Sequence, residues 1–352
     1  MTSRRKLFGI RFPIFLLLMS AAVTLRFIAL FNSFNFYTGY YTDKLLLNIS
    51  AAIVLVGAVF FLAHTFLDRE IKLVPSFTSA ANYLPSALVG TALLFLAKPL
   101  ITAAIALWKN IEELKLIATP SALASAKSLT TTFVIVLLTA LFSVLAAVNF
   151  AVSALSSKHY STKRALLALS TVLFFSFYVA FLYFNRDLPI NAPNKIIDQI
   201  SHLFAAVFFL YEARMAMGRE KLKSYIAIGF ISALTSAYSA IPALLCYATR
   251  GWISSNSIYE IALNLSVFIF VTVRLLQIEY LIEDKPSETV NALISAAEAR
   301  EEAIAPKPQP EEEAEPEQST DRMSDDNQIT IDDVSQTPAE ENAEEVETTE
   351  EI

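Results

Sequence analysis

The sequence is short of cysteine, histidine and glycine, and these shortages exclude several kinds of site. Its one cysteine, Cys246, cannot form an internal disulfide, a CxxC redox pair or a cysteine-based metal cluster. Only three histidines are present, and the seven glycines form no phosphate-binding pattern. The signatures HExxH, GxSxG and Walker A are also missing. We therefore expect no cofactor and no bound metal, and no motif points to a named activity.

Apolar residues are abundant and make up 55% of the chain, which is high for a soluble domain. They gather into eight blocks, each about as long as the 20-residue helix that crosses the hydrocarbon core of a bilayer. A helix also satisfies its own backbone hydrogen bonds in lipid. We predict an all-α, polytopic transmembrane helix bundle of about eight spans, at residues 12–31, 45–67, 84–107, 133–155, 165–184, 196–217, 224–248 and 258–283.

The charge of the chain changes sign near residue 283. Residues 1–283 contain 23 basic and 12 acidic side chains, whereas residues 284–352 contain four basic and 22 acidic ones. The acidic segment has too few apolar residues to offset the entropy of ordering it. We predict a transmembrane domain over 1–283 and a tail over 284–352, with a short helix at about 287–304 and disorder after it. The tail either solubilises the chain through its charge or binds a basic soluble partner.

The distribution of basic residues between the loops predicts the orientation. If the N-terminus is cytoplasmic, the cytoplasmic segments before the tail hold 13 Lys and Arg residues and the outer segments hold seven. The positive-inside rule then places both termini in the cytoplasm. The compact loops favour a plasma membrane. The one longer connection, 108–132, is predicted to form a short amphipathic helix on the outer surface that is broken before Pro120.

Ionisable side chains within the spans are costly in lipid and therefore mark candidate functional residues. Six polar residues fall in the outer half of the predicted spans: Arg26, Lys98, Asp198, His202, Glu260 and Asn264. They could line a cavity that binds a small charged or zwitterionic solute. Alternatively, the two basic residues pair with the two carboxylates and hold the helices in register. One histidine and one aspartate are too few ligands for a metal site.

A second polar set lies near the predicted inner face and consists of His64, Glu212, Arg214, Arg274, Gln277 and Glu279. Long basic side chains at that depth can reach the lipid headgroups. This second set is therefore less informative about function than the outer one.

Three classes of function stay open. The favoured class is a non-enzymatic membrane adaptor or sensor whose acidic cytoplasmic tail contacts soluble partners. The alternative is a small-solute transporter with an outward-facing charged cavity, although the scarcity of glycine and the lack of a visible internal repeat argue against it. A membrane-embedded enzyme built from scattered side chains is the third class. The lipid bilayer is an expected partner in each case, and no nucleic-acid partner is expected.

Overall fold

The computed structural model describes residues 4–6, 10–35, 37–67, 73–75, 79–117, 119–155, 162–184, 189, 191–216, 222–251 and 257–281. Within these ranges eight helices are long and apolar enough to cross a membrane. They are α1 (Arg11–Ser33), α2 (Leu45–Leu67), α3 (Ser79–Ile117), α4 (Pro120–Leu155), α5 (Thr162–Phe184), α6 (Pro193–Ala216), α7 (Leu222–Arg250) and α8 (Ile258–Leu276). Each of the eight predicted ranges overlaps one of these helices, and the predicted class of fold, a polytopic helix bundle, is confirmed.

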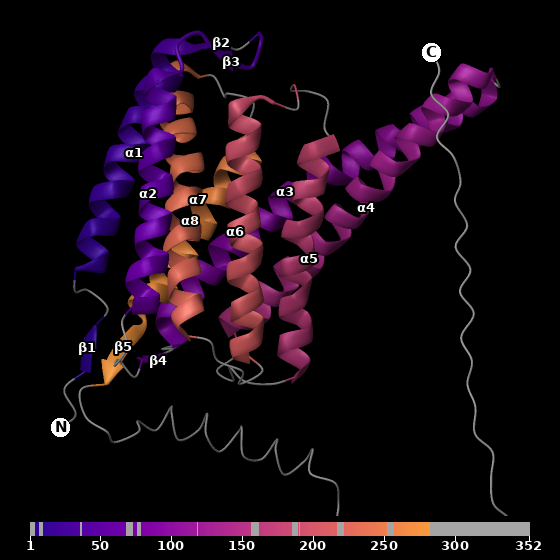
Figure 1. Cartoon of the computed structure of the whole chain (residues 1–352). Coiled ribbons are helices and arrows are strands. Elements are labelled where there is room, and N and C mark those ends of the chain that lie inside the picture. Colours follow the sequence, from indigo (N-terminus) through magenta and orange to yellow (C-terminus); the bar gives the residue numbers. More distant parts are fainter. Residues whose placement is uncertain are drawn as a thin grey trace, which may run out of the picture. The chain divides into compact units, whose positions relative to one another are not determined.

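Five short strands, which the sequence analysis did not predict, lie at the two ends of the bundle (Figure 1). The strands β2 (Phe34–Asn35) and β3 (Tyr40–Tyr41) form an antiparallel pair between α1 and α2. At the opposite end, β1 (Arg4–Lys6), β5 (Ile278–Leu281) and β4 (Leu73–Pro75) form an antiparallel sheet in the order β1-β5-β4. We call these the hairpin end and the sheet end.

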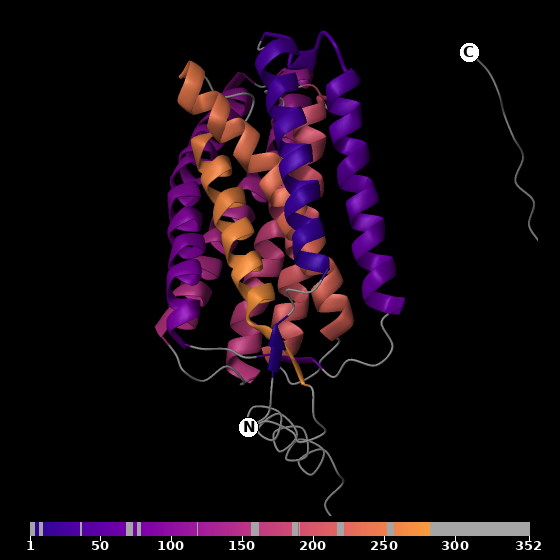
Figure 2. The same cartoon turned by 90° about the vertical axis from the view of Figure 1, so that its left-hand side faces the viewer.

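Helix α7 is the central helix of the bundle (Figure 2). It packs against α1, α2, α6 and α8. In its most apolar 18-residue stretch 78% of the residues are buried, compared with 22% in the corresponding stretch of α2. Small residues allow this close packing. A Cβ atom at Gly229 would lie 2.8 Å from Leu275 Cδ2, so any larger residue would require the Leu275 side chain on α8 to move.

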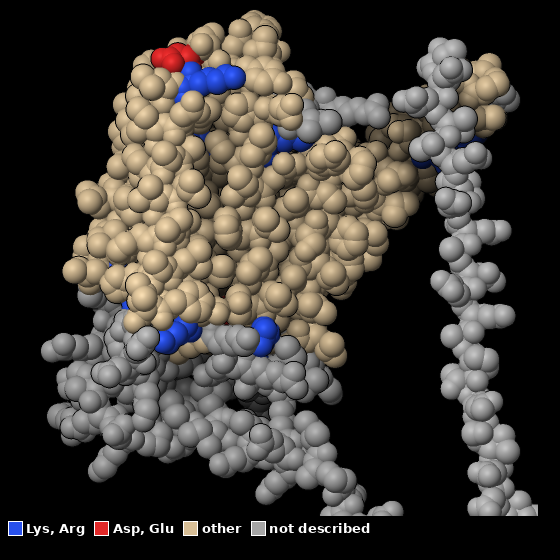
Figure 3. All heavy atoms as spheres, in the orientation of Figure 1, with Lys and Arg blue, Asp and Glu red and all other residues tan. Residues whose placement is uncertain are grey.

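The surface of the bundle is apolar where a bilayer would surround it. Large hydrophobic side chains on α2 and α3 are exposed, among them Leu55, Val59, Phe95 and Ile101. On the face of the molecule drawn in Figure 3, the visible Lys and Arg side chains lie toward the two ends of the bundle, and the belt between them is uncharged. The chain is therefore a multi-pass membrane protein whose helices present apolar side chains to lipid.

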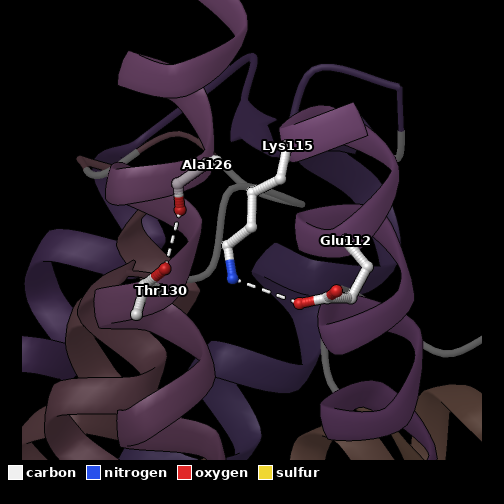
Figure 4. Close-up of polar contacts among 4 residues, drawn as sticks. All are labelled: Glu112, Lys115, Ala126 and Thr130. Carbon is white, nitrogen blue, oxygen red and sulfur yellow. Dashed lines mark hydrogen bonds and ion pairs between the residues drawn. The ribbon is translucent and has the colours of Figure 1, made fainter. Parts of the chain in front are cut away.

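The connection between the third and fourth spans differs from its prediction. Helix α3 continues through the expected amphipathic segment to Ile117, and α4 begins at Pro120, so most of 108–132 extends the two helices. Proline is compatible with the first turn of a helix, which explains why Pro120 begins α4. Figure 4 shows the local contacts: Lys115 Nζ lies 3.1 Å from Glu112 Oε1, and the Thr130 hydroxyl donates to the Ala126 carbonyl at 2.8 Å.

The last span is shorter than predicted. Helix α8 ends at Leu276 rather than near residue 283, and β5 begins at Ile278. The Gln277 backbone N–H donates to the Val273 and Arg274 carbonyls and closes the helix. The predicted tail, including the short helix at 287–304, lies outside the described residues.

Candidate functional site

The six predicted site residues occupy different environments. Arg26, Asp198, His202 and Asn264 are buried in the half of the bundle nearer the hairpin end. Glu260 lies in the first turn of α8. In contrast, Lys98 is exposed on α3. The structure therefore separates Lys98 from the buried members, because sequence depth does not tell which face of a helix carries a residue.

Arg26 donates hydrogen bonds to neutral oxygens. Its guanidinium donates to the Tyr238 carbonyl and, at 3.3 Å from Nη2, to Asn194 Oδ1. The acceptor on α7 is available because Pro242, four residues later, has no N–H to donate to the Tyr238 carbonyl. The guanidinium also lies 4.7 Å from the centroid of the Tyr238 ring. A proline in one helix thus creates the acceptor for a buried cation on another.

Tyr41, on β3, closes this group from the hairpin end. Its hydroxyl donates to Asn194 Oδ1 at 2.7 Å. Burial raises the pKa of Tyr41 to about 12, and the positive charge of Arg26 opposes part of this rise. Tyr41 is therefore a neutral hydrogen-bond donor over the physiological pH range.

A chain of hydrogen bonds links α6, α7 and α8 about one helical turn further from the hairpin end than Asn194. The Ser201 hydroxyl donates to Asn264 Oδ1 at 3.2 Å, and Asn264 Nδ2 donates to Ser239 Oγ at 3.1 Å. The Ser239 hydroxyl then donates to Asp198 Oδ1. Ser201 and Ser236 also share a hydrogen bond of 3.2 Å. All donors in this chain are oriented toward Asp198, as an acceptor carboxylate requires.

We define the hairpin-end cluster as Arg26, Tyr41, Asn194, Asp198, Ser201, Ser236, Ser239 and Asn264. It contains three of the predicted residues and five that the sequence analysis did not select. Asn194 was missed because it precedes the predicted start of its span. The three serines were not selected because a single hydroxyl within a span carries no charge and gives no distinctive signal in the sequence.

His202 is completely buried beside this cluster. Its ring contacts the rings of Tyr178 and Phe175, with centroids 4.8 and 5.7 Å away. Neither ring nitrogen has a hydrogen-bond partner among the described residues. Burying such polar atoms costs free energy, so the surrounding aromatic rings fix the histidine through packing rather than hydrogen bonding.

Glu260 has a structural role at the start of α8. Its carboxylate accepts from the Ser257 backbone N–H at 3.1 Å, and the Ser257 side chain accepts from the Glu260 backbone N–H, which together form a capping box. The Tyr178 hydroxyl also donates to Glu260 Oε1 at 2.6 Å. These contacts hold the carboxylate at the first turn of α8.

A second buried cluster lies toward the sheet end, on α6, α7 and α8. Arg274 Nε lies 2.9 Å from Glu212 Oε1, and the Tyr225 hydroxyl donates to the same oxygen at 2.9 Å. Arg274 Nη1 donates to Gln277 Oε1 at 3.2 Å. We call these four residues the sheet-end cluster. Exposure of 7% and 16% for the Arg274 and Glu212 side chains shows that the pair is buried among the helices.

An apolar layer separates the two clusters along the helices. Phe208 lies between Ser201 and Glu212 on α6, and Phe270 lies between Asn264 and Arg274 on α8. Both phenylalanines are buried, and their ring centroids lie 6.5 Å apart. On α6 and α8, aromatic rings therefore lie between the polar groups of the two clusters.

Metal ligands do not converge within the described residues: no group of three or more His, Cys, Asp or Glu side chains there could hold a metal ion. Comparison with known proteins finds no matching protein-family model, no matching curated protein and no matching solved structure. The two clusters therefore provide the structural basis for a proposed function.

Proposed function

We propose that the protein is a non-enzymatic membrane sensor or adaptor in which the hairpin-end cluster receives a signal and the acidic tail contacts a soluble partner. The positive-inside bias supports a cytoplasmic location for both termini, and the short loops support a plasma membrane. In this orientation the hairpin end faces outward, and the tail follows the sheet end in the cytoplasm.

The observation that carries this proposal is the course of α8. Asn264 on α8 belongs to the hairpin-end cluster, and Arg274, about 15 Å further along the same helix, belongs to the sheet-end cluster. One residue after the helix, β5 begins and pairs with both β1 and β4. A displacement of α8 at the hairpin end would therefore act on the strand that precedes the tail.

The tail supplies the proposed output. Its 22 acidic residues against four basic ones favour a soluble partner with a basic surface. Anionic lipids repel such a segment, which keeps it available for a cytoplasmic protein.

A reporter on the tail tests the proposal. Replacing Cys246 with Ala removes the only cysteine, and Ser324→Cys then accepts an environment-sensitive fluorophore. In reconstituted vesicles, a panel of small carboxylic acids, amino acids and inorganic ions is added on the hairpin-end side. We expect a compound in the panel to change the tail fluorescence, and Asn264→Leu to abolish the change. A silent reporter across the panel would contradict the sensor.

The alternative function is transport of a small polar solute. The two polar clusters on the same helices, separated by the layer of Phe208 and Phe270, favour it because a solute could occupy each side of such a layer in turn. The same vesicles decide between the functions when uptake of each compound is measured. Uptake supports transport, whereas a tail response without uptake supports sensing.

A further inference from the structure

Two buried hydrogen-bond donors in the hairpin-end cluster have no acceptor among the described residues. They are Arg26 Nε and Asn194 Nδ2, and both residues are 1% exposed. Leaving a buried donor unpaired costs free energy, because the group has lost its hydrogen bond to water. Neutral groups of the chain already occupy the neighbouring positions: the Tyr238 carbonyl accepts from the guanidinium, and the Tyr41 hydroxyl donates to Asn194 Oδ1.

The two donors belong to groups that touch each other. Arg26 Nη2 lies 3.3 Å from Asn194 Oδ1, so the guanidinium on α1 and the amide on α6 form one continuous polar surface. The unpaired N–H groups are carried by the same two planar groups. A ligand with two acceptor oxygens could therefore bond to both.

The charge of the Arg26 side chain favours an anion. Three neutral groups contact Arg26: the Tyr238 carbonyl, the Asn194 amide and the Tyr41 hydroxyl. A buried positive charge is stabilised when an anion contacts it directly, and guanidinium groups match the two oxygens of a carboxylate.

We propose that Arg26 and Asn194 form a binding site for a small carboxylate at the hairpin end. This proposal deepens the proposed function, because it names the chemical class of the signal. Simple carboxylates and amino acids share the carboxylate group, so they are separate arms of the test.

The test measures thermal unfolding of the full-length protein in lipid nanodiscs. Sodium acetate and glycine are the two probes, and sodium chloride at matched ionic strength is the control. We expect a saturable rise in melting temperature with at least one carboxylate probe and no saturable rise with chloride. A larger rise with glycine than with acetate indicates that the site prefers an amino acid.

Two variants locate the response. Arg26→Gln should weaken the apparent affinity for the responding probe at least tenfold. Asn194→Asp places a carboxylate oxygen where the amide nitrogen lies, so it should keep or raise the melting temperature without ligand and remove the response to the probe. Lys98→Gln, which changes an exposed cation outside the cluster, should leave the response unchanged.

Three outcomes would overturn the proposal. A saturable rise with sodium chloride that equals the rise with the carboxylates overturns the carboxylate class. No rise with either probe means that the two donors are served by a structural water only. An unchanged response in Asn194→Asp places the binding elsewhere. In each case a tail reporter that responds to another compound would still support the proposed sensor.

Discussion

The hairpin-end and sheet-end clusters each contain a buried arginine, but the two arginines have different partners. At the sheet end, Arg274 pairs with the Glu212 carboxylate, and Tyr225 and Gln277 complete the group. At the hairpin end, Arg26 contacts a backbone carbonyl and a side-chain amide, and both of these partners are neutral.

This difference separates a structural site from a candidate binding site. A carboxylate within the protein neutralises the sheet-end arginine, so that cluster can hold α6 and α8 together without a ligand. The neutral oxygens at the hairpin end leave the positive charge of Arg26 available to an anion. The first four predictions test whether this contrast is real, from the largest expected effect to the smallest.

Arg274→Met should have the largest effect. It removes the cation and leaves the buried Glu212 carboxylate without it, which typically costs about 3–5 kcal/mol of stability. The double variant Arg274→Met with Glu212→Met should recover most of this loss, because no charge is then stranded. Unfolding of both proteins in detergent measures the effect. A single variant as stable as the double would show that the pair does not neutralise a buried charge.

Arg26→Met should cost less, about 1–3 kcal/mol, because it strands neutral oxygens rather than a carboxylate. The same unfolding assay applies. If the loss equals that of Arg274→Met, then Arg26 also neutralises an internal carboxylate, and the contrast between the clusters disappears.

Tyr41 makes the hairpin end sensitive to alkaline pH. Because burial raises its pKa to about 12 in the folded protein, its contribution to stability is complete below pH 10 and is lost as the pH rises toward 12. At pH 11 the expected loss is about 1 kcal/mol, from the difference between pKa values of 10 and 12. Tyr41→Phe should remove this part of the pH dependence between pH 9 and 11. An identical pH profile in the variant would contradict the assignment.

His202→Phe should have the smallest effect and the opposite sign. The substitution keeps an aromatic ring against Phe175 and Tyr178 and removes two buried nitrogens that have no described partner. We expect a gain of about 1 kcal/mol in the unfolding assay. A marked loss would show that the histidine nitrogens bind a group that the structure does not contain.

The sequence predicted the helices well because long apolar runs have few alternatives in lipid. It did not predict the strands, since two to four residues are too short to show a periodic pattern. It also ended the third span early, because Lys109, Glu112 and Lys115 look like the end of a membrane helix although the helix itself continues.

The candidate site was less predictable. Depth along a span identified Arg26, Asp198 and Asn264, but it also selected Lys98, which faces outward. The acceptor for Arg26 depends on Pro242, whose missing N–H affects a carbonyl four residues away. Sequence reasoning could use that relation to find an unpaired carbonyl, but only the packing of α1 against α7 shows which donor meets it.

Hydrogen exchange at β5 tests most directly whether α8 connects the hairpin end to the tail. The variant Asn264→Leu alters the hairpin-end cluster, and Lys98→Gln serves as its control. The account predicts that Asn264→Leu changes the exchange rates of the backbone amides at 278–281 in nanodiscs, while the control leaves them unchanged. A change confined to the hairpin end, with unaltered exchange at β5, would contradict it.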